Sequence, residues 1–302
     1  MHSQLCFKSL FEFCKCSLHT HLTKDIPIVD AHCHLDDFYN NQLFVESLST
    51  TTVRKVYAIS NKHKYQNWNK HLYNSCDNLH VYESFGIHPK FIPEHDLHER
   101  LIQLENIVNS RVNSLSGRPI VGVGEVGFDE TSRYQLIDQK LALERQILIA
   151  RQTDLPLILH CRGYSFFRVL FDYVSSLLPS NHPTQWHCVK SDSDLTVIDN
   201  FISYFSNSII SLNGATTSIK DIDQDKVFKK WIRNHPHILN HLVLETDCPW
   251  LCPQGLSIQR YNPCTGIFIT SKWVENVLRA PGKNASTIVE IANNNANKIF
   301  RF

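Results

Sequence analysis

The sequence lacks three features that would each indicate a particular class of protein. No apolar run approaches the roughly 18 residues of a membrane-spanning helix, so we expect no membrane segment. None of the ten cysteines stands in a C-x-x-C pair, and we interpret them as reduced, mostly buried thiols of an intracellular protein. The net charge of +1 argues against the broad basic field of many nucleic-acid-binding proteins. An anionic substrate must therefore be bound locally, by metal ions or by a few placed cations.

The chain has 302 residues, of which 42% are hydrophobic and 20% charged, and this is ample for a large buried core. It contains no repeat of fixed period and no Gly/Ser-rich linker, and its 17 histidines are unusual. Residues 1–26 match neither a signal peptide nor an Arg-rich transit peptide, and we expect them to lie outside the core. We expect residues 27–302 to form one domain, in the cytoplasm or the nucleus.

Short β-rich runs alternate with amphipathic stretches along the chain. The predicted strands are Ile28–His34, Lys55–Ser60, His80–Gly86, Pro119–Glu125, Leu157–His160, Gln185–Val189, Ser208–Leu212 and Leu242–Thr246. The predicted helices are Asp96–Asn113, Tyr134–Gln152, Tyr164–Leu178, Asp192–Phe205, Asp225–Arg233, Gly266–Arg279 and Ala285–Phe300. The helical pattern is clearest over Tyr134–Gln152, whose apolar stripe comprises Leu136, Ile137, Leu141, Leu143, Ile147, Leu148 and Ala150.

Eight strands with helices between them predict an α/β protein that is a single (β/α)8 barrel of the TIM type. A doubly wound open sheet is the main rival, but no Gly-rich phosphate-binding turn follows the first strand. In a barrel, functional residues come from the C-terminal ends of several strands. Those ends carry His32, His34, Glu125, His160, His187, Glu245 and Asp247.

The first of these ends lies in "IVDAHCHLDDF", where alternation along a strand places His32 and His34 on one face and Cys33 on the other. Any one such residue is more often a hydrogen-bonded polar group, a helix cap or an ion-pair partner than a metal ligand. Leaving Glu245 aside, six polar groups converge at the rim, and such a cluster is unfavourable unless something binds its members together. Four imidazoles and two carboxylates suit two divalent ions with one carboxylate bridging, so we predict a metal site at this rim.

Six motifs together resemble the TatD-type metal-dependent deoxyribonucleases, a branch of the amidohydrolase-like barrels. They are "DAHCHLD", "GIHP", "GVGEVGFD", "LILHCRG", "WHC" and "LETDCPWL", in the order and spacing of that family, and the resemblance covers about Pro27 to Phe302. It implies an eight-stranded barrel, one or two divalent metal ions and hydrolysis of phosphodiester bonds, often exonucleolytic on DNA.

The resemblance also implies roles for individual residues. His32 and His34 would hold one ion, Glu125 would bridge, and His160 and His187 would complete the second site. Asp247 would bind metal and accept a proton from the attacking water. The sequence departs from the family pattern after His187, where "HCVKSDSD" has no glycine, so we expect the substrate contacts of this loop to be altered.

Further residues near these motifs are candidates for contacts with the substrate. Arg162 offers a planar fork that matches a phosphate, although a salt bridge at the barrel rim is an equal alternative. His88, in "GIHP", is interpreted either as a contact to the phosphate or leaving group or as a residue that stabilises the turn. Lys190 and Trp250 are candidate contacts to the backbone and a base of a nucleic acid, although a solvated surface lysine and a packed tryptophan are the more common cases. Asp36 is a candidate to orient the His-x-His strand or to cap the next helix, and not a metal ligand.

These features predict a metal-dependent nuclease that hydrolyses phosphodiester bonds of DNA or RNA from an end, with a metal-activated water as the nucleophile. Mg²⁺, Mn²⁺ and Zn²⁺ are the candidate ions. The near-neutral charge favours a short or end-bound nucleic acid over a long duplex. One alternative is a hydrolase of another bond, such as an aminoacyl ester on RNA, and another is a non-catalytic interaction protein that keeps the fold. The intact set of six candidate ligands argues against the second alternative.

Overall fold

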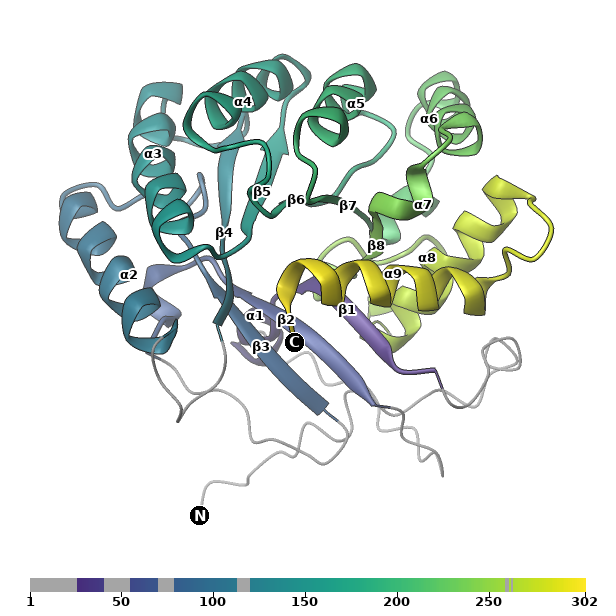
Figure 1. Ribbon diagram of the computed structural model, residues 1–302, viewed down its shortest axis with the longest axis horizontal. Helices are drawn as coiled ribbons and strands as arrows, with labels where there is room; N and C mark the ends of the chain where they lie inside the picture. Colours follow the sequence, from purple (N-terminus) through teal and green to yellow (C-terminus); the bar gives the residue numbers. More distant parts are fainter. Residues whose placement is uncertain (1–25, 41–54, 70–78, 113–119, 259–260, 262) are drawn as a thin grey trace. The chain divides into compact units, whose positions relative to one another are not determined.

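The computed structural model describes residues 26–40, 55–69, 79–112, 120–258, 261 and 263–302. Eight strands lie in this part of the chain and form one sheet in the order β1 to β8, with parallel pairing. Strands and helices alternate along the chain (Figure 1), and the fold is the predicted (β/α)8 barrel. The strands are β1 (Ile28–Cys33), β2 (Val56–Lys62), β3 (Leu79–Phe85), β4 (Ile120–Asp129), β5 (Leu157–Arg162), β6 (Thr184–Trp186), β7 (Ser208–Leu212) and β8 (Leu242–Leu244).

The described helices match the predicted ones to within a few residues, and two short helices, α1 and α7, were not predicted. They are α1 (Leu35–Asn40), α2 (Leu97–Val112), α3 (Leu136–Thr153), α4 (Tyr164–Leu177), α5 (Leu195–Tyr204), α6 (Ile222–Asn234), α7 (Ile238–His241), α8 (Pro263–Leu278) and α9 (Ala285–Phe300). None of these helices is long and apolar enough to cross a membrane. Of the extension predicted at residues 1–26, all but Ile26 lies outside the described residues.

The predicted end of the fourth strand was wrong, because β4 continues four residues beyond Glu125 to Asp129. Its pairing with β5 shifts register between Gly124 and Val126, so Glu125 lies at a bulge inside the strand and not at its end. Gly127 makes this possible, since its φ is 148° and a Cβ there would lie 1.9 Å from the His160 carbonyl oxygen. The glycines of "GVGEVG" therefore let β5 approach the residue that carries the carboxylate.

The described residues divide into two compact units, and the first comprises those within Met1–Ser60, Lys70–Val81 and Leu212–Asn294. It contains β1, β8, the helices α6 to α8 and the part of α9 up to Asn294. Asn293 of α9 donates a hydrogen bond to the Pro27 carbonyl and accepts one from the Val29 amide, at 2.8 and 3.2 Å, which fixes the start of β1. Phe228 of α6 stacks on Trp273 of α8 with ring centroids 5.8 Å apart, and this pair forms part of the unit's core.

The second unit comprises the described residues of Asn61–Asn69, Tyr82–Ser211 and Asn295–Phe302, and it contains β4 to β6 with α2 to α5. Trp186 of β6 is fully buried between Phe167 of α4 and Phe201 of α5, with centroid distances of 5.4 and 5.2 Å. Burying an aromatic side chain of this size contributes on the order of 2–3 kcal/mol. Trp186 thus anchors β6 to α4 and α5.

The apolar stripe predicted for α3 was wrong in its first half. Ile137 and Leu141 are 59% and 55% exposed, whereas Gln139 and Gln146 are buried. Amphipathic periodicity favours apolar residues on the inner face, but a polar side chain takes such a place when it hydrogen-bonds to backbone there. Both glutamines do so, and their partners adjoin the candidate site.

Candidate metal centre

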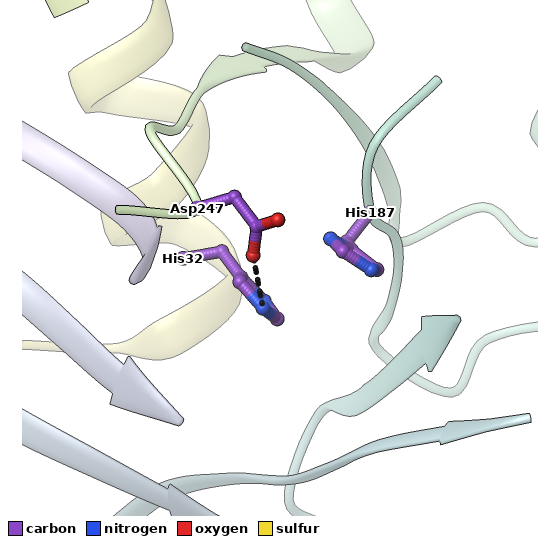
Figure 2. Close-up of side chains that lie close together, drawn as sticks. All are labelled: His32, His187 and Asp247. Atoms are coloured by element: carbon purple, nitrogen blue, oxygen red, sulfur yellow. Dashed lines mark ion pairs between the residues drawn. The ribbon is translucent and has the colours of Figure 1, made fainter. Parts of the chain in front are cut away.

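His32, His34 and Asp247 form a compact cluster in the first unit, which we call the first donor group. The Nε2 atoms of His32 and His34 lie 3.3 Å apart, which confirms that the two rings share one side of β1. The Asp247 Oδ1 atom lies 3.0 Å from His34 Nε2. It also lies 3.5 Å from His32 Nε2, and Figure 2 shows this pair. Two imidazole nitrogens and one carboxylate oxygen therefore form a triangle, and all three residues are buried.

Backbone contacts between β1 and the turn after β8 hold the first donor group together. The Asp247 amide donates to the His32 carbonyl and the His34 amide donates to the Cys248 carbonyl, both at 2.8 Å. Asp247 has a φ of 59°, a left-handed conformation that aspartate tolerates better than most residues. Asp30 adds a side-chain tie, because its carboxylate accepts from the Thr246 amide at 2.9 Å and from the Thr246 hydroxyl at 2.5 Å. Burial raises the pKa of Asp30 to about 7, although the bonds from Thr246 act to lower it.

Glu125, His160 and His187 form the second donor group, which lies in the second unit. Glu125 comes from β4, His160 from β5, and His187 directly follows β6. The Glu125 Oε2 atom lies 3.2 Å from His160 Nδ1 and 3.0 Å from His187 Nε2, and the two nitrogens are 3.0 Å apart. This is again a triangle of two imidazole nitrogens and one carboxylate oxygen.

Two further side chains support the second donor group, and neither was named from the sequence. His63 Nδ1 lies 2.7 Å from the other oxygen of Glu125, so the carboxylate keeps Oε2 turned toward the two ligand imidazoles. Asp129 Oδ2 lies 3.3 Å from His160 Nε2, an arrangement that places the His160 proton on Nε2 and presents Nδ1 to a metal. Burial alone would raise the pKa of Asp129, but hydrogen bonds from His160 and Thr131 hold it well below its usual range.

The donor sets of both groups fit a divalent metal ion. Hydrogen bonds can satisfy at most two sides of such a triangle, because the carboxylate oxygen only accepts, whereas a central cation satisfies all three atoms. Two donors that each lie about 2.1 Å from one ion at a tetrahedral angle are about 3.4 Å apart. The donor separations in the two groups run from 3.0 to 3.5 Å. Each group therefore has the donor chemistry and the spacing to bind a divalent ion.

The second donor group is also electrostatically suited to an ion. Burial alone would raise the pKa of Glu125, but His88, His187 and the hydrogen bond from His160 hold it well below its usual range, so the carboxylate stays ionised. Burial and the nearby His160 lower the pKa of His88, whose ring centroid is 4.3 Å from that of His160. An ionised carboxylate is the protonation state that metal binding requires of Glu125.

His88 and Arg162 lie in the same unit as the second donor group. His88 follows β3 and is buried, and its Nδ1 accepts a hydrogen bond from the Lys90 amide at 3.0 Å. The neutral ring therefore carries its proton on Nε2 and can donate it. Arg162 ends β5 and is exposed, and its guanidinium makes no ion pair or hydrogen bond within the described part of the chain. The rim salt bridge considered for Arg162 is thus absent among these residues.

The remaining candidates have more ordinary surroundings. Lys190 is half-buried and its ammonium group pairs with Asp192, so its charge is locally offset. Trp250 is 47% exposed in the turn after β8, where its amide donates to the Asp247 carbonyl at 2.8 Å. Asp36 is buried at the start of α1. Glu245 is fully buried and accepts a hydrogen bond from the Asn213 amide group at 2.8 Å, so it ties β8 to the end of β7.

His63 and Asp129 could have been found from the sequence by a better placement of strand ends. His63 directly follows β2, which ends at Lys62 and not at the predicted Ser60. Asp129 is the last residue of β4. His32 and Asp247 were selected as polar residues at C-terminal strand ends. The same rule selects His63 and Asp129 once the strands have their observed lengths.

The family model described as TatD-related DNase matches residues 29–301 of the chain. The chain belongs to this family. A 3′-5′ RNA nuclease, TATDN2 of Homo sapiens, is 24% identical over 243 residues, which are 75% of this chain but only 29% of the human protein. A 3′-5′ ssDNA/RNA exonuclease TatD of Edwardsiella piscicida is 28% identical over 226 residues, which are 72% of this chain and 76% of that protein.

Solved structures agree with the fold. The crystal structure of YJJV, a TatD homologue from Escherichia coli, matches with a TM-score of 0.69 at 23% identity and covers 91% of this chain and 98% of the other. A phosphotriesterase homology protein from Escherichia coli, complexed with phosphate in its active site, matches with a TM-score of 0.58 at 13% identity over 91% of this chain and 98% of that one. At these identities the likeness extends to the barrel and its strand order.

Proposed function

We propose that this TatD-family protein is a metal-dependent nuclease that hydrolyses phosphodiester bonds of DNA or RNA from one end. The observation that carries the proposal is the repeated triangle of two imidazole nitrogens and one carboxylate oxygen, at 3.0–3.5 Å, in the first and the second donor group. The printed names of relatives, a 3′-5′ RNA nuclease and a 3′-5′ ssDNA/RNA exonuclease, support a nucleic acid as the substrate and the 3′ end as the point of attack.

The two carboxylates of the donor groups would take different roles. Divalent ions held by these groups would supply Lewis acidity, which activates water and neutralises charge on the phosphate. Asp247 has 12% of its side chain exposed, against 3% for Glu125, so Asp247 is the better placed to accept a proton from water. Glu125 is surrounded by His63, His160 and His187 and serves to hold the second donor group.

Two other residues would act on the phosphate and the leaving group. Arg162 presents an exposed guanidinium, and its fork of donors matches two oxygens of a phosphate. His88 can donate the proton on Nε2 to the leaving oxygen, since its Nδ1 is occupied by the Lys90 amide. Trp250, with 47% of its surface exposed, offers a face on which a base could stack, a contact worth about 1–3 kcal/mol in single-strand binding.

The proposal is tested by incubating the full chain with oligonucleotides under defined metal conditions. Single-stranded DNA, duplex DNA and RNA are labelled at the 5′ or 3′ end and supplied with Mg²⁺, Mn²⁺ or Zn²⁺ in turn. We expect mononucleotides released from the 3′ end and a ladder of shortened 5′-labelled products. Hydrolysis of an aminoacyl ester on RNA without cleavage of the chain would overturn the proposal and support the alternative hydrolase. Binding of RNA without any turnover would support the non-catalytic alternative.

A further inference from the structure

The inner face of α3 carries two buried glutamines seven residues apart. Gln139 is 3% exposed and Gln146 is fully buried, and a spacing of seven places them two helical turns apart on the same face. A buried amide group is unfavourable unless each of its polar atoms is hydrogen-bonded. Each of these two amides bonds to both backbone groups of one residue and to the backbone carbonyl of a second residue.

Gln146 binds the backbone of the residue that precedes His88. Its Oε1 accepts from the Ile87 amide at 2.6 Å, and its Nε2 donates to the Ile87 carbonyl at 3.2 Å and to the Ala142 carbonyl at 2.9 Å. The side chain thus satisfies both polar backbone groups of Ile87, as a neighbouring strand would do. Both peptide planes of Ile87 are fixed, and one of them is shared with His88.

Gln139 binds Asp129 in the same manner at the end of β4. Its Oε1 accepts from the Asp129 amide at 2.8 Å, and its Nε2 donates to the Asp129 carbonyl at 3.2 Å and to the Tyr134 carbonyl at 2.9 Å. The Asp129 carboxylate in turn lies 3.3 Å from His160 Nε2. One face of α3 therefore fixes the backbone on which two side chains next to the second donor group depend.

We propose that Gln139 and Gln146 are positioning residues, which act through Asp129 and His88 on the reacting groups. The inference rests on the proposed nuclease function. Gln146 holds the loop so that the proton on His88 Nε2 is aimed at the leaving oxygen, and Gln139 holds Asp129 so that it selects the tautomer of His160. Each amide must both donate and accept, and no apolar or singly functional side chain of similar size reproduces that pattern.

Glutamate variants test this requirement directly. Glu in place of Gln keeps the acceptor oxygen but lacks the donor unless it is protonated, so Gln146→Glu and Gln139→Glu should regain function as the pH falls. At pH 8 we expect kcat to drop by about tenfold or more with KM little changed, the lower range for losing an outer partner of a metal ligand. The ratio of variant to wild-type kcat should then rise between pH 8 and pH 6. Gln152→Glu, an exposed change on the same helix, should leave the ratio at one throughout.

A second readout does not depend on nuclease activity. In the Zn²⁺-loaded protein with ¹⁵N-labelled histidine, the ring resonances of His88 should move in Gln146→Glu and those of His160 in Gln139→Glu. His182, which precedes β6 at its other end, should not move in either variant. If a glutamate variant fails to fold, the ring resonances are measured in Gln139→Met and Gln146→Met instead. Methionine fills the same space without a charge.

The outcomes separate the two proposals. If the wild type shows no nuclease activity but the ring resonances move as expected, the proposed function fails and the positioning role stands. If the variants lower Tm yet keep wild-type kcat and unchanged ring resonances, the glutamines are structural and the inference is overturned. A ratio of kcat that is already one at pH 8 in both glutamate variants would equally contradict it.

Discussion

The first and the second donor group present the same three donor atoms but are supported in different ways. The first is held mainly by backbone hydrogen bonds, since the Asp247 and His34 amides bond to the His32 and Cys248 carbonyls. The second is drawn from three strands and depends on side chains such as His63 and Asp129. Backbone bonds persist through most substitutions, whereas a side-chain contact is lost with its residue. Single substitutions should therefore disrupt the second donor group more easily than the first.

Removal of metal should have the largest effect and should act on both groups alike. We expect a chelator to reduce nuclease activity to the level of a buffer control, because both triangles would lose their central cation. The fold should persist, since the packed aromatic residues of each unit, such as Phe228 and Trp186, make no use of a metal. Circular dichroism melts with and without chelator test this. Cooperative loss of the fold on chelation would show that the ions are structural.

Changing one carboxylate of each group should separate their roles. Asp247→Asn keeps an oxygen for the metal but cannot accept a proton at neutral pH, so turnover should fall by roughly 10²–10⁴-fold while metal content is retained. Glu125→Gln should instead lose metal, because its two oxygens face His63 on one side and His160 and His187 on the other. Turnover and metal content are measured on the same preparations. Near wild-type turnover by Asp247→Asn with metal bound would exclude Asp247 as the base.

The supporting carboxylates of the two groups should differ in importance. Asp129→Asn should lower activity or metal affinity by about 10- to 100-fold. The single amide oxygen would stay with the Thr131 amide and hydroxyl, so the NH₂ group would face His160 Nε2 in place of an acceptor. Asp30→Asn, in the first unit, should lose less, because the backbone bonds of Asp247 and His34 remain. Metal titrations of both variants provide the comparison, with the exposed change Asp154→Asn as the control. Equal losses in the two variants would remove the distinction between the groups.

The sequence predicted the candidate ligands of both donor groups but not the side chains that support the second. The candidate ligands His32, His34, Glu125, His160, His187 and Asp247 could be named from the sequence because each stands in a motif at or near a strand end. His63 and Asp129 were missed because the predicted strands were too short. No sequence pattern marks Gln139 and Gln146 as buried, because their side chains bond to backbone groups and a backbone partner leaves no trace in the residue types. Periodicity predicts which face of a helix is buried when that face is apolar, and it fails where buried amides bind backbone.

The smallest expected effect concerns stability in acid and lies outside both donor groups. Burial lowers the pKa of His182, whose Nε2 lies 3.1 Å from the Leu155 carbonyl, so the fold disfavours the protonated ring. The unfolded chain binds a proton there below about pH 6.5, and stability from this group is therefore lost as the pH falls through that value. His182→Gln should reduce the fall in Tm between pH 7.5 and pH 5.5 by no more than a few degrees. An unchanged fall in Tm would show that His182 does not contribute.

The central claim is that each donor group binds a divalent ion of its own. It is tested most directly by the metal content per chain of wild type, His32→Ala and His187→Ala after dialysis against trace metal. We predict that the wild type retains ions at both groups, and that each variant loses the ion of its own group and keeps the other. His182→Gln, a histidine change outside both groups, should retain the wild-type content. Equal metal content in all four proteins, or a wild type without bound metal, would contradict the account.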